Sequence, residues 1–212
     1  MKKSSPAYIL LFIVAISAIF GFGVSMVHYS TEDLLERNLA LHRNRTIARA
    51  FDLDVTGDSP QDYLQTVERN VEDTTMVINN RKWEIFFAKD GEGEVGFIFS
   101  GMGFWDRITG ILVLSSGLQT IKDIKFLSQK ETPGLGARIE EQSFTKQFED
   151  LPVDWDTPQE RYIIIGPGNG ANSVDAITGA TQTSLALMKM LNNELHLFRN
   201  AYKEIAKAQR SR

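Results

Sequence analysis

The feature that most constrains this chain is an uninterrupted apolar run close to its N-terminus. Residues 7–28 carry no formally charged side chain and consist mainly of Ile, Leu, Val, Ala and Phe. As an α-helix, this run of about 22 residues would be about 33 Å long, which is enough to cross the hydrocarbon core of a bilayer. A cleaved signal peptide is the alternative, but its apolar region usually ends after about 7–15 residues at a small-x-small site. We therefore predict a single transmembrane helix, and we assign residues 1–29 to a cytoplasmic N-terminus and this anchor.

Basic residues predict the orientation of the anchor. Lys2 and Lys3 precede the apolar run, and by the positive-inside rule such residues stay in the cytoplasm. The rest of the chain would then be exported. We expect a single-pass protein of the inner (cytoplasmic) membrane whose C-terminal domain faces the periplasm or the cell exterior.

Composition argues against several kinds of protein. The chain contains no Cys, so disulfide scaffolds, iron–sulfur clusters and thiol nucleophiles are excluded, and redox chemistry would need a bound cofactor. The formal net charge is −4, and an acidic chain without a basic stripe is a poor partner for nucleic acid. The three His residues lie far apart and have no carboxylate at metal-ligand spacing, so we expect no metal site.

A change in hydrophobic period marks the start of a globular domain. Residues 30–60 have the pattern of a stalk helix followed by a linker, and Pro60 opens a short helix. Segments rich in β-branched and aromatic residues then predict an antiparallel meander at residues 82–89, 94–100, 108–114 and 120–128.

The remaining pattern predicts mainly helices after this meander. We expect a helix at 143–150, a further strand at 161–165 and a long amphipathic helix at 182–207. Strands followed by helices indicate the α+β class. The prediction for residues 61–212 is therefore one α+β domain, an antiparallel sheet flanked by helices.

The segment ETPGLG is the first of two that packing alone does not explain well. Pro fixes φ for the first corner of a type II turn, and the next Gly supplies the positive φ of the second corner. A further Gly leaves the backbone open to a flat ligand, with Leu135 able to lie against its ring. An ordinary strand-to-helix turn is the alternative. The candidate residues are Glu131, Thr132, Pro133, Gly134, Leu135 and Gly136.

The second segment, DAITGATQTS, stands directly before the long final helix. Free backbone N–H groups and the positive end of the helix dipole favour a phosphate beside Thr181 or bonded to it. The alternative is that Thr181 only caps the helix, which is a common role for Thr. The candidate residues here are Asp175, Thr178, Gly179, Ala180, Thr181, Thr183 and Ser184.

In this order, ETPGLG and DAITGATQTS resemble motifs of the FMN-binding subunits of two membrane complexes. These complexes are the Na⁺-translocating NADH:quinone reductase and the Rnf electron transport complex. The resemblance covers about residues 85–190 together with the anchor. It implies that Thr181 carries FMN through a phosphoester bond and that Asp175 is part of the motif recognised during attachment.

A third stretch, residues 101–105, resembles the Gly-x-Gly-x-Trp sequence of the quinone-reductase branch. This likeness implies that Trp105 lies near the flavin. Alternatively, Phe104 and Trp105 fill the core of the domain. Trp105 favours the quinone-reductase branch, whereas the short chain is closer in length to the Rnf protein, so the branch stays open.

The resemblance also implies a function and partners. The chain would relay electrons within an ion-translocating Rnf-type or NADH:quinone oxidoreductase complex, as a redox subunit of a translocase with covalent FMN rather than a stand-alone catalyst. Its partners would be the membrane, other membrane subunits and, during maturation, an exported flavin transferase that uses FAD and Mg²⁺. Two alternatives stay open: an exported domain that binds FMN without a covalent bond, and a flavin reductase that serves another electron chain.

Overall fold

The computed structural model describes residues 5–90 and 93–210, and for residues 205–210 the backbone alone. The chain divides into two units, residues 1–42 and 43–212. Most of the first unit is the N-terminal part of α1 (Pro6–Ala50), one continuous helix that contains the predicted span and stalk helix and whose last turns belong to the second unit. Its apolar stretch has the length and composition of a membrane span, and none of it is buried within the protein. Lys2 and Lys3, on which the predicted orientation rests, lie outside the described residues.

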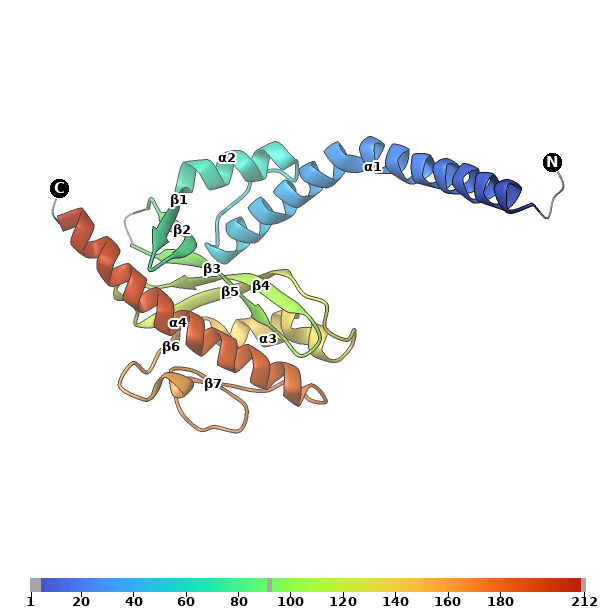
Figure 1. Ribbon diagram of the computed structural model, residues 1–212. Coiled ribbons are helices and arrows are strands. Elements are labelled where there is room, and N and C mark those ends of the chain that lie inside the picture. The colour runs from blue at the N-terminus through green and yellow to red at the C-terminus, as the bar shows by residue number, and fades with distance from the viewer. Residues whose placement is uncertain (1–4, 91–92, 211–212) are drawn as a thin grey trace. The chain divides into compact units, whose positions relative to one another are not determined.

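The second unit is built on a six-stranded antiparallel sheet with the order β1-β2-β3-β4-β5-β6 (Figure 1). The predicted meander and the α+β class are confirmed. The strands are β1 (Val71–Ile78), β2 (Arg81–Ala88), β3 (Val95–Met102), β4 (Arg107–Leu114), β5 (Thr120–Ser128) and β6 (Leu151–Pro152).

Strand β1 is absent from the sequence prediction. It pairs with β2 along its whole length, from Val71 opposite Ala88 to Ile78 opposite Arg81. The two residues between these strands, at 79 and 80, are Asn with φ of 52° and 62°, which is the backbone of a type I′ hairpin turn. Most side chains of β1 are exposed or half-buried, so the strand lacks the apolar alternation by which strands are identified.

Each face of the sheet is covered by a different part of the chain. The long helix α4 (Thr181–Arg210) crosses one face, as Figure 1 shows in red, and buries Leu187, Leu191, Leu195 and Phe198 there. The last turns of α1, together with α2 (Pro60–Asn70), pack on the other face around Phe86. As predicted, α2 begins at Pro60, behind a capping box formed by Ser59 and Asp62.

The segment between β5 and α4 is less regular than its sequence predicts. The expected helix at 143–150 is one turn, α3 (Gln142–Thr145), continued by a 3₁₀ turn. The expected strand at 161–165 is reduced to β7 (Ile164–Ile165), which pairs in parallel with β8 (Ser173–Val174). The 3₁₀ turns of the unit are Ser116–Leu118, Gly136–Glu140, Lys146–Phe148 and Gln159–Arg161.

A buried side chain of α4 explains why the strand is so short. Asn192 accepts a hydrogen bond from the Ile163 backbone N–H at 2.9 Å, and its amide group donates to the carbonyl oxygens of Glu160 and Ile163, both at 2.9 Å. These backbone groups are therefore satisfied by a helix side chain instead of a neighbouring strand.

Candidate functional site

The first candidate segment folds as its residues predict. The Leu135 N–H donates to the Thr132 carbonyl oxygen at 3.1 Å, which closes a turn with Pro133 and Gly134 at its corners. Gly134 has a φ of +74°, as the second corner of a type II turn requires. The chain then enters the 3₁₀ turn at Gly136.

The second segment repeats this arrangement at the start of α4. The Ala180 N–H donates to the Ile177 carbonyl oxygen at 3.0 Å, and Gly179 has a φ of +81°. The buried Ser184 hydroxyl accepts the Ile177 N–H at 3.1 Å and fixes this turn to the helix. Helix α4 begins at Thr181, one residue before the predicted start.

Thr181 is therefore the first helical residue, and its side chain is exposed. Within the part of the chain that the structure describes, its hydroxyl makes no hydrogen bond. A capping Thr would accept a backbone N–H of the first turn with this oxygen. The alternative that Thr181 only caps α4 thus has no support in the geometry, and the hydroxyl is accessible for chemistry.

The two turns and the β3–β4 loop enclose a pocket of about 350 Å³. Its walls include the side chains of Phe104, Trp105 and Leu135, which are 50%, 65% and 44% exposed. The alternative that Phe104 and Trp105 fill the core is therefore wrong, because the loop holds both rings at the surface. The lining residues are Phe104, Trp105, Thr132, Leu135, Gly136, Gly179, Ala180, Thr181, Gln182 and Thr183.

A buried carboxylate lies behind this pocket. Glu131 is 4% exposed, and one of its oxygens accepts the N–H groups of Phe104 at 2.9 Å and Trp105 at 3.0 Å. The other oxygen accepts the Thr183 hydroxyl at 2.7 Å. A Cβ at Gly136 would lie 2.5 Å from that hydroxyl and 2.9 Å from the carboxylate. Gly136 is therefore needed because Thr183 and Glu131 occupy the space that a side chain would fill.

Six predicted site residues do not line the pocket: Glu131, Pro133, Gly134 and Ser184, which belong to the turns and contacts described above, and Asp175 and Thr178. Asp175 and Thr178 are exposed and line a separate hollow of about 200 Å³, beside Arg138 and Gln147. The Asp175 N–H donates to the Gln147 side chain at 2.8 Å. The structure thus brings Thr181, Gly179 and Ala180 to the pocket and leaves the first part of the DAITGAT motif on an adjoining surface.

Two pocket residues are missing from the sequence-based set of candidates. Phe104 is adjacent to Trp105, and their rings are 5.0 Å apart between centroids in an edge-to-face arrangement. Gln182 stands inside the second segment, directly after Thr181, and lines the pocket with it. Both positions could have been found as immediate neighbours of candidate residues.

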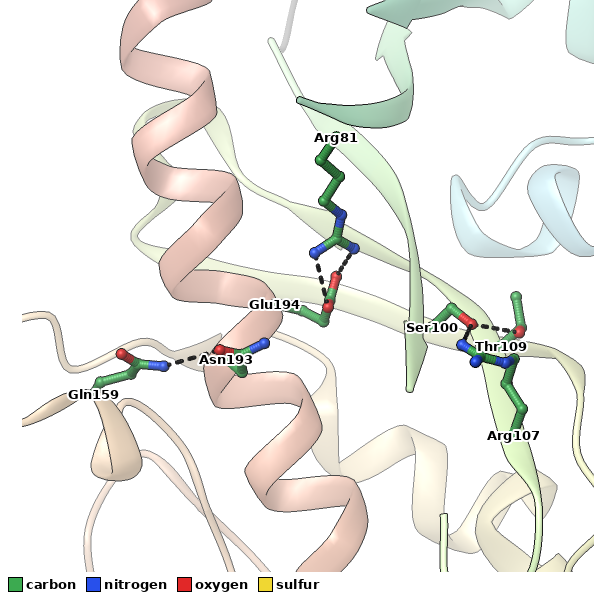
Figure 2. Close-up of polar contacts among 7 residues, drawn as sticks. All are labelled: Arg81, Ser100, Arg107, Thr109, Gln159, Asn193 and Glu194. Atoms are coloured by element: carbon green, nitrogen blue, oxygen red, sulfur yellow. Dashed lines mark hydrogen bonds and ion pairs between the residues drawn. The ribbon is translucent and has the colours of Figure 1, made fainter. Parts of the chain in front are cut away.

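A second groove, of about 470 Å³, continues from the pocket between β3 and α4 and shares Phe104 and Gln182 with it. Polar side chains line its far part, as Figure 2 shows: Ser100 lies 3.1 Å from the Thr109 hydroxyl, and Glu194 forms a paired contact with Arg81. Both contacts are internal to the protein, so these groups stabilise the wall of the groove.

Asp106 follows Trp105 in the β3–β4 loop and carries a charged side chain. Its carboxylate accepts the Arg107 N–H at 2.7 Å and pairs with Lys130 at 3.1 Å. These two contacts, the backbone hydrogen bond first, hold the pKa of Asp106 below its usual value. In the described ranges, 5–90 and 93–210, no group of three or more His, Asp or Glu side chains could hold a metal ion.

Comparison with known proteins gives a consistent result. Residues 103–196 match the FMN-binding domain family, a range that contains every residue lining the pocket. The NqrC subunit of the Na⁺-translocating NADH-quinone reductase from Pasteurella multocida is 31% identical over 107 residues, which are 48% of this chain and 41% of that protein. The same protein from Neisseria meningitidis serogroup B is 28% identical over 142 residues, which are 63% of this chain and 54% of that protein. This chain thus spans about half the length of these relatives.

Two solved structures have the same fold. NqrC from Parabacteroides distasonis superposes with a TM-score of 0.65 at 21% identity, covering 77% of this chain and 92% of that one. NqrC from Shewanella oneidensis gives 0.56 at 17% identity, covering 73% and 96%. At these identities the superpositions establish the shared fold alone.

Proposed function

We propose, from the premise that this chain belongs to the family of FMN-binding subunits related to NqrC of the Na⁺-translocating NADH-quinone reductase, that it carries FMN bonded to Thr181 and relays electrons. The observation that carries the proposal is the exposed Thr181 hydroxyl, which makes no hydrogen bond within the described chain and stands at the first position of a long helix beside an aromatic-walled pocket. FMN, when bound, exchanges one or two electrons with a donor and an acceptor.

The residues present fit FMN. Its phosphate would lie at the N-terminus of α4, where free N–H groups and the helix dipole favour negative charge. Its flat ring system would contact the exposed side chains of Trp105, Phe104 and Leu135, for which the fold offers no buried position. Gly179, with no side chain, leaves room for the phosphate beside Thr181.

The anchor and the relatives support a proposal for the setting of this relay. We assign residues 7–28 of α1 to the membrane as a single span with the FMN domain on the exported side, and other membrane subunits of an ion-translocating oxidoreductase as partners of this chain. The relatives favour a complex of the NADH-quinone reductase type over the Rnf type. A flavin transferase would form the bond to Thr181 during maturation.

The test is the covalent bond itself. The full chain is coexpressed with a flavin transferase, and its band in a denaturing gel is viewed under ultraviolet light. We expect fluorescence for the wild type and for Thr181→Ser, which keeps a hydroxyl, and none for Thr181→Ala. Far-ultraviolet circular dichroism checks that Thr181→Ala is folded.

Two results would contradict the proposal. The first is a fluorescent Thr181→Ala band, which would place the flavin on another residue. The second is a dark wild-type band in a preparation where the same transferase labels a known substrate protein. FMN that copurifies with the folded protein but leaves it on denaturation would then indicate a noncovalent carrier.

A further inference from the structure

The Glu131 carboxylate receives hydrogen bonds from two segments that are far apart in sequence. The residue follows β5, and its donors are the N–H groups of Phe104 and Trp105 in the β3–β4 loop and the hydroxyl of Thr183 in the first turn of α4. Among the described residues, no Lys, Arg or His side chain forms an ion pair with it. The carboxylate therefore joins three parts of the pocket by hydrogen bonds alone.

The β3–β4 loop is short, and its central N–H groups would ordinarily face water. The loop is closed by a hydrogen bond from the Gly103 N–H to the Asp106 carbonyl oxygen at 2.8 Å. A Cβ at Gly103 would lie 2.4 Å from the nearer Glu131 oxygen, so the missing side chain provides the space that this oxygen occupies. The loop is thus shaped around the carboxylate.

Burial cannot hold the two aromatic rings of this loop in place. Phe104 and Trp105 are half or more exposed, and exposed side chains gain little stability from packing. Their position relative to Thr181 then depends on the backbone, which the hydrogen bonds from their N–H groups to the buried Glu131 side chain hold in place.

We infer that Glu131 is a positioning residue of the flavin site, which holds the aromatic wall of the pocket at a fixed distance from Thr181 without contacting the flavin. This inference rests on the proposed function for the identity of the ligand. The reach of the side chain is what matters: its two oxygens must meet the loop on one side and Thr183 on the other. Gln at this position keeps that reach, whereas Asp keeps the charge and is one methylene too short.

The first experiment needs no flavin. Hydrogen–deuterium exchange of the full chain in detergent micelles is measured by mass spectrometry on peptides containing residues 103–106. We expect exchange to be about tenfold faster in Glu131→Asp, because the loop N–H groups lose their acceptor, and close to wild type in Glu131→Gln. Glu194→Asp is the matched control, since Glu194 is also 4% exposed but bonds to Arg81, and it should leave this loop unchanged.

The second experiment reads the flavin in protein that has been loaded by coexpression with a transferase. Contact with Trp105 should quench FMN fluorescence, so Glu131→Asp is expected to fluoresce at least twofold more strongly per bound FMN, and Glu131→Gln and Glu194→Asp like the wild type. The visible circular dichroism of the flavin should change in Glu131→Asp alone.

The outcomes separate the two claims. Unchanged loop exchange in Glu131→Asp, or an equal increase in Glu194→Asp, would overturn the positioning role whether or not flavin is bound. Faster exchange without any change in flavin fluorescence would overturn it as a role toward the flavin. A wild-type chain that takes up no FMN would refute the proposed function, while the exchange pattern would still decide whether Glu131 holds the loop.

Discussion

Apolar side chains are buried around the middle of α4 and exposed around its first turn. In the middle, Leu191 and Phe198 are fully buried against the sheet. Beside the first turn, Phe104, Trp105 and Leu135 are 44–65% exposed, although they belong to ordered turns closed by hydrogen bonds. The same helix therefore stabilises the domain through its middle and leaves an apolar surface unused by the fold at its N-terminal end, where a ligand can use it.

The buried carboxylates of the two regions also differ, in the kind of partner that each one binds. Glu194, in the middle, pairs with Arg81, whose guanidinium also lies over the Trp83 ring at 4.1 Å from its centroid. Glu131, near the first turn, accepts hydrogen bonds from two N–H groups and one hydroxyl and has no cationic partner among the residues that the structure describes. The first fixes α4 to the β1–β2 hairpin and contributes to stability, and the second fixes loops around a pocket.

The largest expected effect is in the middle of α4. The Phe198 ring stacks on that of Phe97 with centroids 4.1 Å apart, and both are fully buried. Phe198→Ala should lower the free energy of unfolding by about 3–5 kcal/mol, because it removes buried area and leaves a cavity. Urea unfolding of the full chain in detergent, followed by circular dichroism, measures this loss. A loss below about 1 kcal/mol would mean that the middle of the helix is not part of the stabilising core.

A smaller loss is expected at the ion pair. Arg81→Ala leaves the buried Glu194 carboxylate without its cation, and we expect about 2–4 kcal/mol of destabilisation, reduced from the upper end because Arg81 is one-third exposed. Replacing both residues, Arg81→Met with Glu194→Leu, should recover most of the loss, since no unpaired charge remains. If the double variant is less stable than Arg81→Ala, the pair itself stabilises the domain by more than its desolvation costs.

Sequence patterns predict the parts of the structure that depend on residues close together in the sequence. The Pro133–Gly134 turn, the strands over residues 82–128 and the start of α2 all follow from residues a few positions apart. The contacts of Glu131 do not, because its partners lie 26, 27 and 52 residues away. For the same reason a motif read along the chain joins Asp175 to Thr181, whereas the fold places them in separate hollows.

A third carboxylate, that of Asp123, shows whether an ion pair with a Lys offsets the cost of burying the charged form. Asp123, on β5, is largely buried and pairs with Lys125. Burial, opposed in part by that Lys, raises the pKa of Asp123 above its usual value. The folded state therefore favours the protonated form, so this group's contribution to stability is present at acid pH and is lost as the pH rises through the raised pKa.

The corresponding prediction compares Asp123→Asn with the wild type by urea unfolding between pH 3 and pH 7. The stability of the variant relative to the wild type should increase over this range, by less than the loss in Arg81→Ala. A relative stability that falls with pH would show that Lys125 outweighs burial, and Asp123 would then resemble Glu194.

The smallest effect on stability, and the sharpest test of the comparison, is expected at Trp105. Trp105→Ala removes a side chain that is 65% exposed, whereas Trp83→Ala, the matched control, removes one that is 3% exposed. Without flavin, the first should change the free energy of unfolding by about 0.5 kcal/mol or less and the second by about 3–5 kcal/mol. Flavin fluorescence in the FMN-loaded protein should show the opposite order, with the larger change in Trp105→Ala. This substitution should increase the fluorescence, because a quenching ring beside the pocket is lost. Equal destabilisation by the two substitutions would show that Trp105 belongs to the core, and the exposed aromatic wall could then no longer be explained by a ligand.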